Sequence, residues 1–415
     1  MKYIFLAEPI DYFLCMKWLL KTRIGYTPIV LMLMVLNLGN CTMVFPILAP
    51  FSDLPSPTGP YTVATRHATW IDSSRDESFT PEEDYRKIVV QVWFPVSEQT
   101  GLDPLPYIDD PSLRLTALAR QLRLPRSFIN HFRNVHTNTY EIPGTPDLLG
   151  TFPVILFSHG LSGMRFQNTS LVEELVSYGY ILVAADHSYG ANITIFDDGE
   201  SAEYRAAKRR SLNEDFLNNV DLSQLAIIVG DLRFMLDMLF KSPTDSLLKD
   251  LPLDVNHVGV MGHSLGGAAV VNTMAVDQRV KAAMILDGWY APVPDSVVAA
   301  GLDKPIFHLG QKAWRNPDNY ARMDELFLHS SGPTFKMLVP GTRHTDFTDM
   351  PLFTPFSLLI GYTAAKNQLW LNNLIRVNTT CFFNVYLKDH PVSEVQNQIR
   401  SERDVTSYIF VPLLP

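Results

Sequence analysis

The sequence predicts an α/β fold with a mostly parallel central sheet and helices on both of its faces. Short runs of β-branched residues alternate with helical patterns along the chain, which is typical of βαβ units. Several of these runs are apolar throughout, as expected for strands that are covered on both faces. The runs expected to form strands are 87–94, 154–158, 181–185, 257–262, 282–287, 305–310 and 334–340.

The composition is that of a globular protein. Of the 415 residues, 47% are hydrophobic and 19% are charged, which is enough apolar material for a sizeable core. The net charge of −9 disfavours a nucleic-acid-binding function, because proteins of that class carry basic surfaces. The three cysteines show neither a disulfide framework nor the CxxC spacing of a metal site: Cys15, Cys41 and Cys381.

An uncharged segment, residues 29–50, lies close to the start of the sequence. As a helix it is long enough to span a hydrocarbon core of about 30 Å. Basic residues precede it, which by the positive-inside bias places the N-terminus in the cytoplasm: Lys17, Lys21 and Arg23. We therefore expect residues 1–52 to be a membrane anchor that holds the domain formed by residues 53–415 on the extracytoplasmic side. Two alternatives stay open, namely cleavage of the segment, which would release a secreted protein, and a buried hydrophobic arm.

Beyond this segment, a Pro-rich stretch at residues 53–60 is expected to be the linker into the domain. Apolar residues recur at three- and four-residue spacing within 211–240, which predicts a long helix with one apolar face. Two segments, about 105–145 and 190–222, are expected to leave the sheet as cap excursions near the site. The first contains a helical pattern over 112–132, and the second contains a charged stretch.

The motif that carries the chemistry is the hexapeptide GHSLGG at residues 262–267. The apolar run 257–262 leads into it as a predicted strand, and residues 268–275 follow as a predicted helix. A nucleophile elbow has this order of strand, sharp turn and helix, and its glycines let the neighbouring backbone approach closely. The sequence therefore predicts an α/β-hydrolase fold with Ser264 as the nucleophile. The alternative is a glycine-rich turn without chemistry.

A serine nucleophile needs a histidine to take its proton and a carboxylate to orient that histidine. In this fold the chain order is serine, acid, histidine. Asp287 ends the apolar run 282–287, which is the next predicted strand after the elbow. A carboxylate directly after five apolar residues is expected to be there for an electrostatic role. Asp303 is the rival acid, but its surroundings, Gly-Leu-Asp-Lys-Pro, are typical of a turn. Asp287 is therefore the favoured acid.

His344 is the favoured base, because it follows the predicted strand 334–340 in the loop from which a catalytic histidine can reach the serine. His308 lies inside a predicted strand and is expected to be a core or supporting residue. His263 belongs to the elbow and cannot readily fold back as the base. The remaining candidates lie at predicted helix ends: His329 and His390.

Two backbone amides are needed to hold the negative charge that develops on the substrate oxygen. The amide of Leu265, directly after the nucleophile, is the first candidate. The second is expected from the loop after the strand 154–158, where the sequence continues His-Gly-Leu-Ser-Gly. The best candidate in that loop is the amide of Leu161, and a plain glycine-rich turn is the alternative.

Together these residues resemble the platelet-activating factor acetylhydrolase family, in the branch shared by secreted vertebrate members and membrane-anchored bacterial members. The resemblance implies a triad of Ser264, Asp287 and His344, oxyanion donors at Leu161 and Leu265, and no metal or other cofactor. The similar segments, in the order of the family, are residues 60–61, 92–95, 157–161, 185–187, 262–267, 286–289 and 341–344.

The resemblance further implies a serine ester hydrolase that acts on phospholipids with short or oxidised sn-2 acyl chains. Two departures limit this inference: Thr345 differs from the residue in vertebrate members, and residues 353–375 have no counterpart that can be placed. A general short-chain carboxylesterase or polyester hydrolase therefore stays open, as does a non-catalytic binding protein of the same fold. The expected partners are a lipid or small ester and the membrane, with no nucleic acid, and the oligomeric state is left open.

Overall fold

The computed structural model describes residues 50–97, 102–142, 150–205, 214–242, 244–314, 316–359 and 361–410, with the side chains of 214–223 excepted. The chain divides into two compact units, residues 1–49 and 50–415, and the second unit carries the whole described fold. The expected anchor falls almost wholly outside the described residues and stays a prediction. Within the described ranges, no helix combines the length and the apolarity needed to cross a bilayer.

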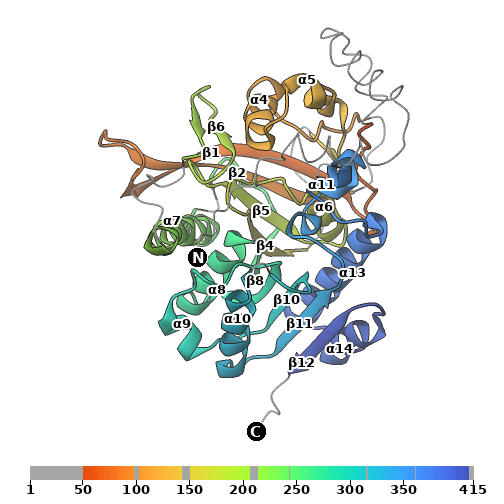
Figure 1. Cartoon of the computed structure of the whole chain (residues 1–415). Coiled ribbons are helices and arrows are strands. Elements are labelled where there is room, and N and C mark those ends of the chain that lie inside the picture. Colours follow the sequence, from red (N-terminus) through yellow and green to blue (C-terminus); the bar gives the residue numbers. More distant parts are fainter. Residues whose placement is uncertain are drawn as a thin grey trace, which may run out of the picture. The chain divides into compact units, whose positions relative to one another are not determined.

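A ten-stranded sheet forms the centre of the second unit (Figure 1). Its strand order is β12-β11-β10-β9-β8-β4-β5-β2-β1-β3. Neighbours from β11 to β5 are parallel, whereas β2 runs antiparallel to β5 and to β1, and β12 runs antiparallel to β11. The strands are β1 (Thr62–Asp76), β2 (Tyr85–Val96), β3 (Thr139–Tyr140), β4 (Phe152–Ser158), β5 (Ile181–Asp186), β8 (Leu253–His263), β9 (Val280–Leu286), β10 (Ile306–Gln311), β11 (Thr334–Val339) and β12 (Thr406–Phe410). A separate hairpin joins β6 (Ile193–Ile195) to β7 (Ser201–Glu203).

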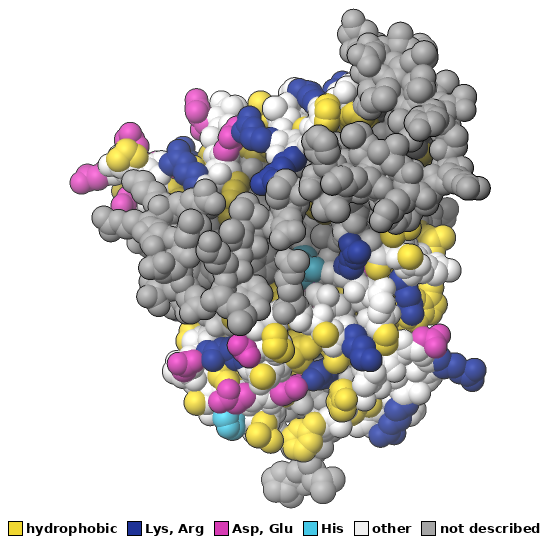
Figure 2. Space-filling view, in the orientation of Figure 1, with side chains coloured by type: hydrophobic (Ala, Val, Ile, Leu, Met, Phe, Trp, Pro, Cys, Tyr) yellow, Lys and Arg dark blue, Asp and Glu magenta, His cyan; other side chains and the backbone are white. Residues whose placement is uncertain are grey.

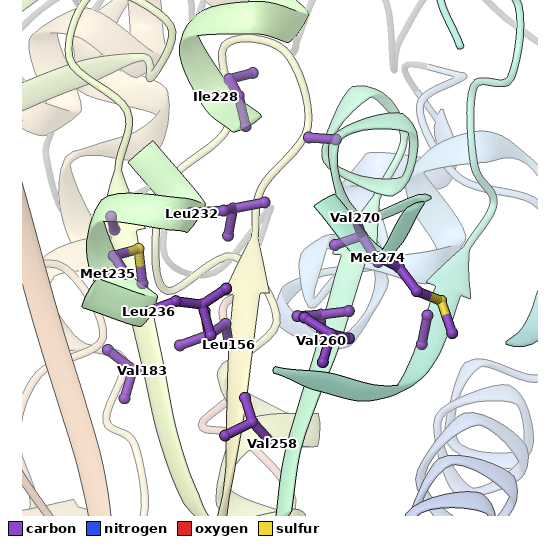
Figure 3. Packing of buried hydrophobic residues seen from close by; sticks show 14 of the residues in the cluster. Leu156, Val183, Ile228, Leu232, Met235, Leu236, Val258, Val260, Val270 and Met274 are labelled. Carbon is purple, nitrogen blue, oxygen red and sulfur yellow. The ribbon is translucent and has the colours of Figure 1, made fainter. Parts of the chain in front are cut away.

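Alternate residues of the parallel strands face two separate hydrophobic cores. In β4, Val154 and Leu156 belong to one core, while Ile155 and Phe157 belong to the other. Successive side chains of a strand point to opposite faces of the sheet, so a run that is apolar throughout supplies both cores at once. Figure 3 shows part of the first core, where Leu156 and Val260 lie between the side chains of two covering helices.

Helices cover both faces of the sheet. The first core is closed by α7 (Glu214–Lys241), α8 (Leu265–Val276), α9 (Asp295–Ala300) and α10 (Asp318–His329). The second core is closed by α4 (Pro111–Leu122), α6 (Thr169–Ser177), α13 (Gln368–Leu387) and α14 (Val392–Ser401). In Figure 1, α7 and α8 lie to the left of the sheet, and α6 and α13 lie to its right. The short helices α11 (Met350–Phe353) and α12 (Phe356–Leu359) come after a 3-10 turn at His344–Phe347.

Each of the seven runs predicted as strands overlaps a strand of the sheet. Two strands towards opposite sides of the sheet, β1 and β12, are not predicted from the sequence. Exposed and partly buried residues recur along both strands, so neither forms the continuous apolar run by which the central strands are recognised.

The long predicted helix is present as α7, which runs from Glu214 to Lys241 in the described part of the chain, while 211–213 lie outside it. Its predicted apolar face is buried where side chains are described, with Leu232 and Leu236 fully inaccessible. This face packs on the central strands, as Figure 3 shows for the same two leucines.

The helical pattern over 112–132 is divided among three elements. α4 ends at Leu122, and Arg123 then adopts a positive φ of 55°. A new helix, α5 (Arg126–Ile129), begins after Pro125, and a 3-10 turn follows it. A proline disfavours helical backbone at the residue before it, so the chain breaks at this point.

The face drawn in Figure 2 carries basic and acidic side chains interspersed with one another.

Candidate active site

Ser264 lies in a sharp turn between β8 and α8. Its backbone has φ 57° and ψ −120°, a positive-φ conformation that residues other than glycine rarely adopt and that stores strain. Hydrogen bonds of its backbone to the end of β9 and the segment after it hold it there. The Ser264 amide donates to the Leu286 carbonyl oxygen at 3.1 Å, and the Trp289 amide donates to the Ser264 carbonyl oxygen at 3.0 Å. The turn leaves 7% of the serine surface exposed at the end of β8.

Two glycines allow the turn to pack this tightly. A Cβ atom on Gly262 would come within 2.4 Å of the Gly266 carbonyl oxygen, and one on Gly266 would come within 2.1 Å of the Ser158 carbonyl oxygen. Both neighbours are backbone atoms, so neither can swing aside as a flexible side chain would. Gly262 is therefore required by the tight turn of the elbow itself, and Gly266 by the close approach of the elbow to the end of β4.

Asp287 follows β9 directly, and its side chain is fully buried. Its carboxylate accepts five hydrogen bonds: from the Gln311 amide (3.0 Å) and side chain (2.8 Å), Trp314 Nε1 (3.1 Å), the Tyr320 hydroxyl (3.2 Å) and His344 Nδ1 (2.6 Å). Burial alone would raise the pKa of this carboxyl, but the hydrogen bond and charge of His344 outweigh burial and hold the pKa below its ordinary value. Asp287 is therefore ionised near neutral pH.

His344 begins the 3-10 turn after β11 and connects buried Asp287 with the surface, because 36% of its side chain is exposed. A carboxylate can only accept a hydrogen bond, so the 2.6 Å contact with Asp287 requires the proton on His344 Nδ1. Nε2 of the neutral ring is then an acceptor, which is the form that a general base needs. The indole of Trp314 packs edge-on against this ring, with the centroids 5.0 Å apart.

His263, a residue of the elbow, contacts His344 directly. The two imidazole rings stack with their centroids 4.6 Å apart, and His263 Nε2 donates to the His344 carbonyl oxygen at 3.2 Å. Ser264 follows His263 directly, but among the described residues its hydroxyl makes no hydrogen bond to His344. Such a bond is often long in enzymes without substrate and shortens in the substrate complex. The structure thus joins Asp287 to His344 directly and places Ser264 beside them without a hydrogen bond.

The predicted oxyanion donors lie in the loop after β4 and at the start of α8. Gly160 packs directly on the elbow, since a Cβ atom there would lie 3.0 Å from the Ser264 Cβ atom. The amides of Leu161, the next residue, and of Leu265 donate to no acceptor in the described part of the chain. Leu265 is the first residue of α8, where the helix dipole adds a partial positive charge. Both amides are therefore unpaired, and both belong to segments that contact Ser264.

The rival candidates make other contacts. Asp303 is exposed in the turn before β10. His308 is buried within β10, with Nδ1 3.1 Å from the Tyr290 hydroxyl, and burial lowers the pKa of its imidazole to about 4. Two more histidines make local contacts at or just after helix ends: His329 and His390. None of these residues is hydrogen-bonded to Ser264 or Asp287.

Three donors to Asp287 are not found by the sequence analysis: Gln311, Trp314 and Tyr320. They come from the end of β10, from the loop after it and from α10. Their contact with Asp287 depends on how this loop and helix fold back over β9, which no local pattern encodes. The one available signal is that they follow the strand next to the one that ends at Asp287.

A second serine, histidine and aspartate form a hydrogen-bonded chain beside the predicted oxyanion loop. Ser158 Oγ, at the end of β4, lies 3.0 Å from His187 Nε2, and His187 Nδ1 lies 2.9 Å from Asp231 Oδ2 on α7. Each of the three residues is at most 1% exposed. Burial would raise the pKa of Asp231, but the ion pair with Arg86 outweighs it, so the pKa lies below its ordinary value.

Curated relatives of this chain have been named as acetylhydrolases. The platelet-activating factor acetylhydrolase of Bos taurus is 31% identical over 231 residues, which are 51% of this chain and 51% of that protein. The enzyme of the same name from Canis lupus familiaris is 28% identical over 231 residues, with the same coverage. The chain thus spans about half the length of these relatives. A protein of Arthroderma benhamiae named "Probable 1-alkyl-2-acetylglycerophosphocholine esterase" is 25% identical over 320 residues, which are 72% of this chain and 76% of that protein.

A solved structure and a family profile extend these similarities over most of the chain. The structure of a ferulic acid esterase from Streptomyces cinnamoneus superposes with a TM-score of 0.69 and 24% identity, covering 86% of this chain and 99% of that chain. At this identity the likeness shows the fold alone, and with the strand order it confirms the predicted α/β-hydrolase fold class. The profile of the family described as "Platelet-activating factor acetylhydrolase, isoform II" matches residues 49–390. The chain therefore belongs to the platelet-activating factor acetylhydrolase family.

Proposed function

We propose that the chain is a serine-dependent ester hydrolase that removes short or oxidised sn-2 acyl groups from phospholipids. The observation that carries the proposal is the pairing of His344 with the buried carboxylate of Asp287, next to the strained elbow that presents Ser264. The names of the relatives support the choice of substrate, because they are acetylhydrolases and a probable 1-alkyl-2-acetylglycerophosphocholine esterase.

The proposed reaction has two steps. His344 Nε2 takes the proton of the Ser264 hydroxyl, and the oxygen attacks the ester carbonyl to form a tetrahedral intermediate. When this collapses, the bond to the leaving alcohol breaks and the His344 imidazolium returns the proton to that alcohol. Water, deprotonated by the same imidazole, then attacks the acyl-enzyme and releases the carboxylic acid and the free serine.

Two groups of residues stabilise charge in this scheme. Asp287 stabilises the imidazolium through its 2.6 Å hydrogen bond, and its other donors keep the carboxylate in position. The unpaired amides of Leu161 and Leu265 hold the oxyanion of the intermediate. Removal of one such donor typically costs about 10²–10³ in rate.

The test is hydrolysis of p-nitrophenyl acetate and of phospholipids that carry either an acetyl or a long acyl chain at sn-2. Ser264→Ala is expected to abolish hydrolysis of every substrate that the unaltered protein cleaves, with the circular dichroism spectrum unchanged. Ser401→Ala, which changes an exposed serine at the end of α14, is the matched control and is expected to keep full activity. Activity retained by Ser264→Ala would contradict the proposal, and equal turnover of acetyl and long-acyl phospholipids would contradict the substrate class.

A membrane anchor at residues 1–52 is part of the proposal and brings the site to its lipid substrate. It rests on the uncharged run 29–50 and the basic residues before it. The expected result is that the full chain stays with membranes after extraction at alkaline pH, and that protease added on the extracytoplasmic side digests the catalytic domain. A shortened protein recovered in the medium would show cleavage and secretion instead.

A further inference from the structure

We propose that His159 is a positioning residue that turns the amide of Leu161 toward the substrate oxygen by holding the Gly160 carbonyl group. The inference rests on the proposed function, because it explains how one of the proposed oxyanion donors, the amide of Leu161, is held in its orientation. His159 does not touch the reacting atoms. It acts through the peptide group between Gly160 and Leu161.

The protonation of His159 follows from its two hydrogen bonds. The backbone amide of His187 donates to His159 Nε2 at 3.2 Å, and an amide can only donate, so Nε2 carries no proton. The proton of the neutral ring is therefore on Nδ1, which donates to the Gly160 carbonyl oxygen at 2.7 Å. Burial, followed by the charge of His187, lowers the pKa of His159 to about 4, so the ring stays neutral at physiological pH.

The geometry of the peptide group transmits this contact to Leu161. The C=O of Gly160 and the N–H of Leu161 belong to one trans peptide plane and point in opposite directions. The Gly160 oxygen also accepts a hydrogen bond from the Gly163 amide at 2.9 Å. With His159 and Gly163 both donating to this oxygen, the plane is fixed and the Leu161 N–H points away from His159. That N–H has no acceptor among the described residues, while Gly160 packs on Ser264.

His159 is itself held by buried neighbours. His187 supplies the amide that fixes its protonation, and the side chain of His187 is bonded to Ser158 and Asp231. Asp231 accepts two hydrogen bonds from Arg86, at 3.0 and 2.7 Å. The oxyanion loop is thereby connected through side chains that are at most 2% exposed to helix α7 and strand β2. We call Ser158, His187, Asp231 and Arg86 the buried anchor.

Two substitutions distinguish the role of Nδ1 of His159 from that of Nε2. In His159→Asn, the amide nitrogen can take the position of Nδ1, so the hydrogen bond to the Gly160 oxygen is kept. In His159→Gln, the amide reaches the position of Nε2, so the contact with the His187 amide is kept and the donor to Gly160 is lost. His257→Gln changes a partly exposed histidine bonded to Asp254 and is the control for a histidine replacement away from the loop.

The readout is the ratio of kcat for p-nitrophenyl acetate to kcat for its thionoester, in which sulfur replaces the carbonyl oxygen. Sulfur is a weak hydrogen-bond acceptor, so the thionoester gains little from the oxyanion donors. We expect His159→Gln to lower kcat for the oxygen ester about 10-fold or more, with KM and the thionoester rate changed much less. His159→Asn and His257→Gln are expected to keep the ratio close to that of the unaltered protein.

A second measurement uses a trifluoromethyl ketone, whose adduct with Ser264 places an oxyanion at the same amides. Its inhibition constant is expected to rise in His159→Gln by about the same factor by which kcat falls. If His159→Gln fails to fold, His159→Ala takes its place as the variant without a donor to Gly160: a fallen ratio in His159→Ala with an unchanged ratio in His159→Asn supports the inference, and an unchanged ratio in His159→Ala or a fallen ratio in His159→Asn overturns it. Equal losses on both esters would also overturn it and would show a structural role. If the unaltered protein hydrolyses neither ester, the proposed function itself fails. If the unaltered protein is active and His159→Gln keeps its ratio, this inference alone fails.

Discussion

Two serines of this chain lie beside a histidine that is hydrogen-bonded to a buried aspartate. Within the buried anchor, three of the four side chains form an unbroken serine–histidine–aspartate chain, with Ser158 3.0 Å from His187 and His187 2.9 Å from Asp231. In the candidate active site, His344 and Asp287 are 2.6 Å apart, and the serine is not hydrogen-bonded to the histidine. By hydrogen-bond geometry alone, the buried anchor would be chosen as the active site.

Access and backbone conformation separate the two arrangements. Ser158 is fully buried at the end of a regular strand, and His187 is 1% exposed. Ser264 lies at the start of a helix with a strained positive φ, and the side chain of His344 is 36% exposed. Unpaired amides adjoin Ser264, whereas every hydrogen-bonding atom of the His187 ring is already satisfied within the protein. These differences in access, backbone conformation and free donors favour Ser264 over Ser158 as the proposed nucleophile.

The largest expected difference is in labelling by a fluorophosphonate probe. The probe reacts with an accessible, activated serine, so it is expected to label the unaltered protein and Ser158→Ala but not Ser264→Ala. Loss of the nucleophile is expected to lower kcat by at least about 10³-fold. Gel fluorescence and intact mass measure both effects. Labelling that persists in Ser264→Ala and disappears in Ser158→Ala would reverse the assignment of the two serines.

The two aspartates are expected to fail in different ways. Asp287→Asn should lower kcat for p-nitrophenyl acetate by about 10³–10⁴-fold, because an amide cannot stabilise the imidazolium and favours the wrong tautomer. Kinetics of the purified variant measure this loss, and thermal unfolding checks that the variant is folded. Nearly full activity of Asp287→Asn would contradict the proposed role of Asp287 in the reaction.

Asp231→Asn should instead reduce stability, because it leaves the buried Arg86 guanidinium with less negative charge around it. The free energy of unfolding is expected to fall by about 3 kcal/mol, a typical cost of breaking a buried ion pair. Urea denaturation followed by fluorescence measures it. A fully stable but inactive Asp231→Asn would place the buried anchor in the chemistry and erase the distinction between the two arrangements.

Buried histidines predict how stability depends on pH. Burial lowers the pKa of His159 and His308 to about 4 and that of His263 to about 3, against an ordinary value near 6.5 in the unfolded chain. At these three histidines the unfolded state binds protons first as the pH falls, so their contribution to stability is complete above about pH 6.5 and is lost progressively toward pH 4.

Urea denaturation at several pH values between 7.5 and 4.5 measures this loss. His308→Asn, which changes a histidine outside both serine arrangements, should make the dependence shallower by about 2 kcal/mol across that range. An equally steep dependence in the variant would show that His308 does not stay neutral in the folded protein.

The smallest expected effect belongs to Ser158→Ala. The substitution leaves His187 Nε2 without its partner at 3.0 Å, and such a loss costs about 1–2 kcal/mol of unfolding free energy. The rate of ester hydrolysis is expected to stay within about threefold, because the other contacts of the loop after β4 remain. Stability and kcat measured on the same preparation test this, and a loss of activity without a loss of stability would contradict it.

The parts of the fold that could be predicted from sequence are those encoded by local patterns. The central strands are apolar runs, and the elbow combines such a run with closely spaced glycines. The choice of Asp287 and His344 used the chain order of the fold, and the structure pairs them. The strand β1 could not be predicted because its polar residues interrupt the apolar run. The break between α4 and α5 could not be predicted either, because the spacing of apolar residues continues across Arg123 and Pro125, where the helix ends.

Contacts between distant segments could not be predicted. The donors Trp314 and Tyr320 reach Asp287 only because the loop after β10 and α10 fold back over it. Ser158, His187 and Asp231 come from two strand ends and a helix, and each residue type is ordinary in its own surroundings. Their meeting is a property of the packed sheet and helix, so a single sequence offers no spacing rule for it. The anchor expected at residues 1–52 stays a prediction, because it lies almost wholly outside the described residues.

The buried anchor also bears on how the protein acquires activity during folding. Arg86 and Asp231 are 145 residues apart in sequence, so their ion pair closes a very long loop and forms only when α7 docks on the sheet. The elbow itself is a local turn, whereas the loop after β4 is linked to this long-range contact through His187 and His159. A refolding chain can therefore regain its helices and strands before it regains turnover. The rate at which ester hydrolysis returns during refolding would then report the rate at which α7 packs on the sheet.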